Sequence, residues 1–557
     1  MLKIRVLPLA LLVIGNHVCA QQVPVANGQM QQIPLAPKIQ TTPAKVVVNQ
    51  QSTAQAQGGD QSTMLVNNLN ITGALAYSEA ELIRVTGFQA NSTLNLDQLR
   101  AMAAKISSFY HEHGYFVAQA YLPAQDIRNG VLTITVLEGH YGKIALNNQS
   151  NVSNGLLNGY LDGLQQHDVI TAPALENRLL LLSDLPGIRV NSVLAPGSKL
   201  GESDLTIDVT QGARISGSVD VDNAGNRYTG EYRLGLSVNF NEPLGQGDVA
   251  SLRALTSGAG LRYLRGAYQM QFGKLKAGVA YSALEYKLGE EFEALGAHGN
   301  TKVASAFIGY PLIRSRSKNL YGQLGYDAKT FKDYVDAFGT VADKQSKLVI
   351  ASLYGDFRDS VDFQSSGAQT NYSLSFTAGE LDLQSPVMRS FDAITAQQNG
   401  HFNKVNFSLS RLQNLSDSVT LFGSISGQMA SKNLDVSEKM ELGGMYAVRA
   451  YPEGEAFADQ GVLANLELRW QLPMSNASSS QWQLIGFVDA GRVDTNKNPW
   501  TNARNHRSLS GAGLGLTWSD YNNFVVKAYY AKKLGNESAT SAPDKSGRFW
   551  IQAVKYF

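Results

Sequence analysis

The spacing of apolar residues changes near residue 213. From there to residue 557, apolar and polar positions alternate with a period of two, which is typical of β-strands that have one apolar face. About sixteen such segments can be counted, and they begin near Arg214, Glu231, Asp248, Leu261, Lys274, Thr301, Asn319, Gln345, Ala368, Gly400, Ser418, Val462, Trp482, Ser508, Phe524 and Arg548. We therefore predict sixteen strands, joined by connections that largely alternate between short and long.

Residues 64–212 show the pattern of two small α/β units. In the first unit, residues 64–139, amphipathic spacing over Asn95–His113 predicts a helix, and Ser78 with Glu81 resembles a capping box at the start of a shorter one. Strands are predicted at Leu65–Ile71, Tyr115–Tyr121 and Val131–Leu137. Residues 140–212 repeat this order, so the sequence predicts two tandem β-α-α-β-β domains.

The first residues have the pattern of a secretory signal peptide. Lys3 and Arg5 precede an apolar run, and small residues end at Ala20, so we predict a signal peptide over residues 1–20. Cys19 offers a lipoprotein interpretation as an alternative, which the residues before it disfavour. Residues 21–63 are rich in Gln, Ala, Pro and Thr and are predicted to form an extended arm or linker.

The composition fits a β-rich protein with many turns and one apolar face per strand. Only 17% of the 557 residues are charged, below the usual quarter, and glycine is frequent at 52 residues. No stretch after the signal peptide approaches the ~20 consecutive apolar residues of a membrane helix. A closed β-barrel can still cross a membrane, because its strands satisfy their backbone hydrogen bonds internally. The net charge of +1 gives no indication of a nucleic-acid partner.

A long predicted connection, residues 431–461, carries the most distinctive residues of the barrel region. It contains Arg449, and about forty residues later Asp489 lies inside an otherwise apolar strand. Asp489 shares one strand face with Phe487 and Gly491, whereas the other face is apolar and is predicted to contact lipid. Because a charge inside a strand usually needs a partner, we predict that Asp489 faces the lumen and pairs with Arg449.

Residue patterns of enzymes are weak in this sequence. Ser, His and Asp residues are scattered without a nucleophile-elbow pattern, and no phosphate-binding G-x-x-x-x-G-K-[ST] loop occurs. The His111-Glu112-His113 stretch is interpreted as the polar end of a helix in preference to a metal site. We therefore predict no catalytic residue, no metal site and no cofactor.

Three stretches resemble the transporter partners of two-partner secretion systems, the family of haemolysin and filamentous-haemagglutinin secretion/activation proteins. GYFVAQAYLPAQDIRNG at Gly114–Gly130 is similar to the family's first POTRA domain, VRAYPEGEAFADQG at Val448–Gly461 resembles its loop signature, and FVDAG at Phe487–Gly491 resembles its barrel-wall motif. The resemblance implies α+β periplasmic domains, which are two tandem POTRA domains (64–139 and 140–212), followed by a 16-stranded transmembrane β-barrel (213–557).

In that family the loop enters the barrel lumen and its arginine pairs with the aspartate of the wall. The resemblance therefore implies a gating or structural motif made of Val448, Arg449, Ala450, Tyr451, Asp459, Gly461, Phe487, Asp489 and Gly491. Ala450 and Ala458 depart from the signature, which more often has glycine at both positions. Family members often begin with a helix that plugs the barrel, and the prolines of residues 21–63 leave this point open.

The resemblance implies an outer-membrane transporter that recognises a large unfolded exoprotein and moves it to the cell surface without ATP. Candidate contacts with the exoprotein are Tyr115, Val117, Gln119, Tyr121, Leu156, Leu157 and Tyr160, at a strand edge or beside a helix. Other implied partners are outer-membrane lipid, lipopolysaccharide and, during biogenesis, the barrel assembly machinery; the expected state is a monomer. A barrel assembly factor and a passive porin-like channel remain alternatives.

Overall fold

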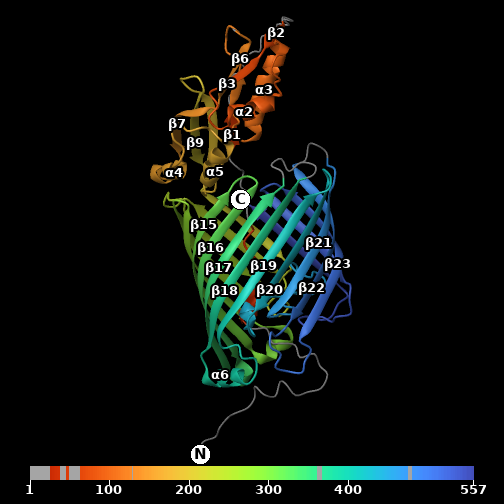
Figure 1. Cartoon of the computed structure of the whole chain (residues 1–557). Coiled ribbons are helices and arrows are strands. Elements are labelled where there is room, and N and C mark those ends of the chain that lie inside the picture. Colours follow the sequence, from red (N-terminus) through yellow and green to blue (C-terminus); the bar gives the residue numbers. More distant parts are fainter. Residues whose placement is uncertain (1–25, 38–44, 49–62, 128, 360–366, 475–478) are drawn as a thin grey trace, which may run out of the picture. The chain divides into compact units, whose positions relative to one another are not determined.

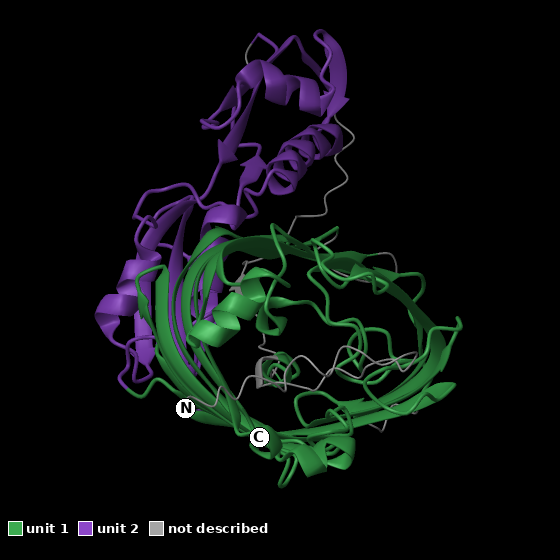
Figure 2. Cartoon of the chain, turned by 90° about the horizontal axis from the view of Figure 1, so that it is seen from below, with its two compact units in different colours: residues 1–41, 214–243, 248–557 green, residues 42–213, 244–247 purple. Residues whose placement is uncertain are grey.

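The computed structural model describes residues 26–37, 45–48, 63–127, 129–359, 367–474 and 479–557. The predicted signal peptide and much of the predicted arm lie outside these described residues. The chain divides into two compact units, coloured separately in Figure 2. One unit contains Met1–Thr41, Arg214–Pro243 and Asp248–Phe557, and the other contains Thr42–Ala213 and Leu244–Gly247.

The first unit is a closed barrel of sixteen strands, β10 to β25, in which each strand pairs with its neighbour in sequence. The ring of strands is seen from the side in Figure 1 and from one end in Figure 2. Antiparallel pairing of β10 with β25, from Ser218↔Tyr556 to Asp222↔Gln552, closes it. Every predicted strand start lies within five residues of an observed one, which confirms the predicted barrel. The strands are β10 (Ile215–Asp222), β11 (Arg233–Asn241), β12 (Val249–Thr256), β13 (Leu261–Phe272), β14 (Leu275–Lys287), β15 (Ala297–Arg314), β16 (Lys318–Val335), β17 (Thr340–Arg358), β18 (Ala368–Leu383), β19 (Gly400–Asn414), β20 (Val419–Ala430), β21 (Gln460–Gln471), β22 (Ser480–Asp494), β23 (His506–Asp520), β24 (Phe524–Lys533) and β25 (Gly547–Tyr556).

The barrel presents large apolar side chains outward. In β21, Leu466, Leu468 and Trp470 alternate with less exposed residues and are 53%, 51% and 46% exposed. The outward face of β14 similarly carries exposed Val279 and Tyr281. A barrel in lipid requires this arrangement, because its outer surface must be apolar while the strands satisfy one another's backbone groups.

Short helices occur in connections of the barrel unit and in its N-terminal segment. They are α1 (Ala26–Gln31), η1 (Glu290–Leu295), η2 (Asp336–Phe338), α6 (Pro386–Ala393) and η3 (Val436–Glu438). Helix α1 contacts residues of the barrel unit directly: the Thr229 hydroxyl donates to Gln29 Oε1 at 2.8 Å, and Gln31 Nε2 donates to the Val436 carbonyl at 2.8 Å. The described part of the predicted arm therefore contains a short helix that packs against the barrel unit.

The second unit contains two α/β domains. The first has a three-stranded sheet ordered β3-β6-β5 and a separate two-stranded ladder of β2 with β4. Its helix α3 begins with a complete capping box between Asn95 and Gln98, and Ser78 caps the shorter helix α2. Its elements are β2 (Thr63–Val66), β3 (Asn68–Thr72), α2 (Glu79–Thr86), β4 (Ser92–Asn95), α3 (Leu96–Glu112), β5 (Gln119–Tyr121) and β6 (Val131–Leu137).

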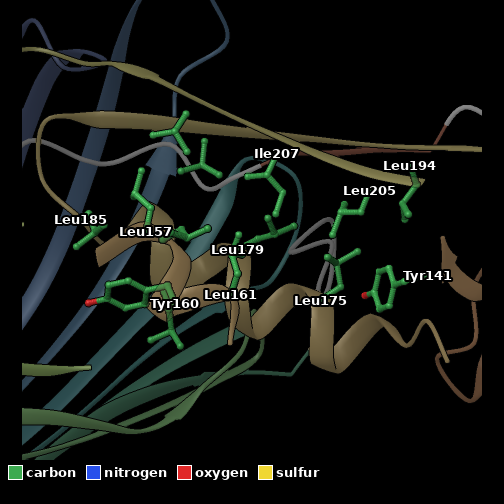
Figure 3. Close-up of a cluster of buried hydrophobic side chains, with 14 of the residues drawn as sticks. Tyr141, Leu157, Tyr160, Leu161, Leu175, Leu179, Leu185, Leu194, Leu205 and Ile207 are labelled. Carbon is green, nitrogen blue, oxygen red and sulfur yellow. The ribbon is translucent and has the colours of Figure 1, made fainter. Parts of the chain in front are cut away.

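The second α/β domain has a four-stranded sheet ordered β1-β8-β9-β7. Its outermost strand β1 comes from the predicted arm and pairs in parallel with β8. Helices α4 and α5 cover one face of the sheet and enclose an apolar core (Figure 3). The elements are β1 (Lys45–Val48), β7 (His140–Gln149), α4 (Asn154–Leu161), α5 (Ala172–Ser183), β8 (Ile188–Pro196) and β9 (Glu202–Gln211).

Two predicted strands of the first domain are wrong in their extent. Leu65–Ile71 is two strands, because β2 pairs with β4 while β3 pairs with β6, and Asn67 lies between them. Tyr115–Tyr121 is a strand only from Gln119, because the Ala118 N–H donates to the Tyr115 carbonyl and closes a turn. The first difference comes from pairing with two different strands and the second from a local turn, and the alternation of side chains shows neither.

A buried carboxylate holds the first domain together. Glu138 Oε1 accepts hydrogen bonds from the Tyr110 hydroxyl at 2.8 Å and from the Leu75 and Ala76 N–H groups at 2.6 and 2.7 Å. Replacing Glu138 by alanine leaves these donors without their acceptor, and we expect a loss on the order of 1–3 kcal/mol in domain stability. Limited proteolysis of the full chain measures this as faster cleavage within residues 64–139.

Glu112→Ala is the matched control for this prediction, because Glu112 is exposed at the end of α3. It removes the same negative charge without removing the buried acceptor. Equal cleavage rates for the two variants would contradict the structural role of Glu138.

Candidate functional site

The connection between β20 and β21, residues 431–459, forms the centre of the candidate site. It folds back on itself, with an antiparallel bridge between Met440 and Ala458 and a further bridge between Gly443 and Val448. Its residues contact side chains on several strands of the barrel, and Figure 2 shows chain of this unit inside the ring of strands. We call residues 431–459 the lumen loop.

The structure brings Arg449 of the lumen loop onto Asp489 of β22. Arg449 Nη2 lies 2.7 Å from Asp489 Oδ1, and Nε donates to Asp489 Oδ2 at 2.9 Å, so the guanidinium binds the carboxylate through two parallel bonds. The Arg449 backbone N–H also donates to Asp489 Oδ2, at 3.1 Å. Asp489 is fully buried and Arg449 is 4% exposed, so each charge depends on the other for compensation.

Further residues, which the sequence had not indicated, surround this pair. Glu467 of β21 binds the remaining nitrogen of the guanidinium, with Arg449 Nη1 2.7 Å from Glu467 Oε1. Asn465 Nδ2 donates to Asp489 Oδ1 at 2.8 Å, and the Trp550 indole N–H donates to the Arg449 carbonyl at 2.7 Å. Asp489 was selected because it is a charged residue inside a strand with alternating apolar positions. Glu467 meets the same criterion and could have been predicted in the same way.

Aromatic and small residues complete the site that holds the Arg449 side chain, which we call the Arg449 seat. The Arg449 guanidinium carbon lies 3.5 Å from the centre of the Phe487 ring, which is a close cation–π contact. Val448 and Ala450 are fully buried in the same cluster. A Cβ atom on Gly511 of β23 would lie 2.5 Å from Ala450 Cβ, so the glycine at 511 leaves room for the methyl group of Ala450.

The other predicted motif residues lie in the lumen loop, directly after it or, for Gly491, on β22 beside it. Asp459 is fully buried and accepts hydrogen bonds from the Leu434 N–H at 3.0 Å and the Lys497 N–H at 2.7 Å. The Tyr451 hydroxyl donates to the Glu537 carbonyl at 3.0 Å. Gly461 and Gly491 stand where a Cβ would collide with Val493 and Leu442, respectively, so both positions require a small residue.

Two acidic residues of the lumen loop, Glu441 and Glu453, lie close enough for their charges to interact. Burial raises the pKa of Glu453 to about 7, with Arg233 opposing the shift and Asp222 adding to it. Burial, followed by the charge of Glu453, raises the pKa of Glu441 as well. These carboxyls therefore hold a proton at a pH where an ordinary glutamate is ionised.

We expect the buried position of the lumen loop to become less stable as the pH rises towards about 7. An unfolded glutamate titrates at about 4.3, so proton binding to Glu453 stabilises the folded loop fully below about pH 4.3, and this contribution falls as the pH rises to about 7. Channel openings in planar bilayers should be more frequent at pH 8 than at pH 6. Glu453→Gln should flatten this dependence, and an unchanged pH response in that variant would contradict the assignment.

Comparison with known proteins identifies the family. Residues 201–518 match the haemolysin secretion/activation protein family ShlB/FhaC/HecB, and residues 64–139 match the ShlB-type POTRA domain. The chain belongs to the haemolysin secretion/activation family. It is 32% identical over 484 residues to the heme/hemopexin transporter protein HuxB of Haemophilus influenzae, covering 86% of this chain and 84% of that protein.

Other relatives of the family agree with this match. The chain is 26% identical to the outer membrane transporter CdiB of Dickeya dadantii, over 78% of this chain and 76% of that protein. The structure of CdiB from Escherichia coli shares the fold with a TM-score of 0.67 at 20% identity, covering 93% of this chain and 94% of that chain. The family shares a barrel with POTRA domains, as the resemblance of the sequence implied.

Family membership and fold together define the activity. The protein is an outer-membrane transporter of a two-partner secretion system, with its POTRA region in the periplasm and a secreted exoprotein as its partner. Among the described residues, no helix combines the length and the apolar character needed to cross a membrane.

The seven predicted exoprotein contacts of the POTRA region fall into different environments. Gln119 and Tyr121 lie on β5, at an edge of the three-stranded sheet, and are exposed. Tyr115 packs against the rings of Tyr77 and Tyr110, while Val117 and Leu156 lie partly buried against the core of the second domain.

Leu157 and Tyr160 are a correction to the predicted contacts. They are 0% and 3% exposed and belong to the core shown in Figure 3. Helix α4 turns both side chains toward the sheet, so they stabilise the second domain and offer no surface to an extended polypeptide. The sequence could not decide this, because an amphipathic helix shows its apolar face without showing whether that face is covered.

Proposed function

We propose that the lumen loop is the gate of this transporter and that the Arg449–Asp489 pair holds it closed. The observation that carries the proposal is the burial of a loop arginine against a wall aspartate inside a closed barrel. Such a contact positions the loop but can be broken without unfolding a strand. Passage of an unfolded exoprotein then requires the loop, and the segment that contains α1, to move aside.

The exposed edge of β5 is the proposed first contact for the exoprotein. An extended chain can add to a sheet edge through backbone hydrogen bonds, which accept many sequences. Gln119 and Tyr121 present side chains at this edge. Our proposal gives no direct contact with the exoprotein to the other five predicted residues, which are Tyr115, Val117, Leu156, Leu157 and Tyr160.

Transport in this proposal uses no nucleotide. Folding of the exoprotein outside the cell supplies the free energy, because folded chain cannot return through the barrel. The proposed working unit is a monomer in contact with outer-membrane lipid and lipopolysaccharide, and the barrel assembly machinery inserts it. The higher identity to HuxB than to CdiB favours a cargo of the class that HuxB handles.

A secretion assay tests the proposal. In cells that lack the chain, the partner exoprotein should remain in the periplasm while the levels of other barrels stay normal. A general fall in barrel levels with intact exoprotein export would instead identify an assembly factor. Photo-crosslinking from position 121 should capture the exoprotein, and position 160 serves as the buried control.

A further inference from the structure

A second set of ion pairs joins the lumen loop to the barrel wall, at strands other than the seat of Arg449. Glu438 lies in η3 and contacts two lysines of the wall, with Lys329 Nζ 2.7 Å from its Oε1 and Lys404 Nζ 2.8 Å from its Oε2. Next to it, Asp435 lies 2.9 Å from Lys344 Nζ. The three lysines belong to β16, β19 and β17, respectively.

These charges are removed from water. Glu438 is 3% exposed, Asp435 is 5% exposed and Lys344 is 9% exposed. Burial raises the pKa of Glu438, but attraction by Lys329 and Lys404 outweighs it and leaves the pKa below its ordinary value. Glu438 is therefore an ionised group whose two cationic partners both come from the wall.

The same segment touches the helix at the start of the described chain. Gln31 Nε2 of α1 donates to the Val436 carbonyl at 2.8 Å, and a Cβ on Gly28 would lie 3.6 Å from Val436 Cγ2. On the other side, Gln428 Nε2 of β20 donates to the Glu438 carbonyl at 2.9 Å. Residues 435–438 thus connect α1 to the wall lysines.

We propose that Asp435 and Glu438, held by Lys329, Lys344 and Lys404, form a second latch that positions the lumen loop and α1 together in the closed channel. The latch rests on the proposed gating function and adds to it a site on different strands. The Arg449 seat uses β21 and β22, whereas the latch uses β16, β17 and β19. Opening then requires both contacts to be released, because either one alone still ties the loop to the wall.

Single-channel recording in planar bilayers, with the full chain and no exoprotein, tests the latch. Glu438→Gln removes the charge that pairs with two partly buried ammonium groups, so the frequency of openings should rise several-fold. Asp343→Asn is the matched control, because Asp343 pairs with Lys332 at 3.1 Å between neighbouring wall strands and does not touch the loop. Openings at the wild-type frequency in Glu438→Gln, or an equal rise in Asp343→Asn, would overturn the proposal.

A second variant covers the case in which Glu438→Gln fails to insert. The triple variant K329Q/K404Q/E438Q removes all three charges and keeps hydrogen-bonding side chains of similar size, so no unpaired charge remains. Its openings should be more frequent than in the wild type, because the ionic attraction is lost, and its barrel should migrate as a folded species in unheated gels. A folded triple variant with wild-type openings would refute the latch.

The bilayer recordings and the secretion assay test the latch and the proposed function independently. The bilayer recordings contain no exoprotein, so they report the latch even if the chain has another role in cells. If instead the variants open more often while deletion of the chain leaves exoprotein export intact, the latch stands and the proposed secretion role fails.

Discussion

Arg449→Ala is expected to reduce exoprotein secretion to about a tenth or less while the barrel still inserts and folds. The substitution leaves Asp489 fully buried without its cation, and breaking a buried pair in this way typically costs about 3–5 kcal/mol. About 1.4 kcal/mol corresponds to a tenfold change in an equilibrium, so the loop should leave its wall site in most molecules. A loop without this site is expected to obstruct the lumen, because it can no longer open and reclose in the defined way that the proposed gate requires. The amount of exoprotein in the culture medium, relative to the amount of barrel in the membrane, measures this.

Arg492→Ala is the control for this prediction, because Arg492 is an exposed arginine on β22. It should secrete at the wild-type level. Combining Arg449→Ala with Asp489→Ala removes both charges, and the double variant should fall short of the sum of the two single effects because the residues share one interaction. Normal secretion by Arg449→Ala, or full additivity, would contradict a functional role of the pair.

Exchange of the two charges should not restore function. Asp489 accepts from the Arg449 backbone N–H and from Asn465 Nδ2 as well as from the guanidinium. An arginine at position 489 has only N–H donors, so it could not accept the hydrogen bonds from the backbone N–H of residue 449 and from Asn465. The site therefore requires an acidic residue on the wall at position 489. Opposite charges at the two positions are not sufficient.

The strands and the inward position of Asp489 could be predicted because both depend on local alternation, whereas its pairing with Arg449 was a hypothesis that the family resemblance also implied. A period of two marks a strand wherever one face is apolar, and the same parity placed Asp489 on the inner face of β22. Glu467 could have been predicted by the same reasoning. Asn465 and Trp550 could not, because their contacts with the pair depend on the register of β21 against β22 and on the closure of the barrel at β25.

The contacts of the latch lysines could not be predicted from the sequence. Lys329, Lys344 and Lys404 are spread over about seventy-five residues, and a lysine in a barrel strand is equally compatible with a water-filled lumen. Only the folded position of the lumen loop brings Glu438 between two of them. The burial of Leu157 and Tyr160 is a similar case, since contact with the sheet decides which helix face is covered.

Gly511→Val is expected to displace the lumen loop and to reduce secretion strongly. Its first added carbon would lie 2.5 Å from Ala450 Cβ, 3.2 Å from the Lys532 carbonyl oxygen and 3.5 Å from the Ala450 nitrogen. Overpacking of a filled core typically costs about 1–3 kcal/mol, and here the cost falls on the residue next to Arg449. Secretion per folded barrel measures the effect, and faster protease cleavage within residues 431–459 reports the displaced loop.

Ala450→Gly should partly rescue the Gly511→Val variant, because it removes the methyl group that meets the new side chain. Rescue should be incomplete, since the Lys532 carbonyl still lies close to the added carbon. Gly486→Val is the matched control: Gly486 lies on β22 and a Cβ there meets no atom within 4 Å. Equal loss in the control, or no rescue by Ala450→Gly, would mean that the clash with Ala450 does not decide the position of the loop. Rescue would instead show that alanine at 450, where the family signature more often has glycine, is accommodated by a glycine on the neighbouring strand.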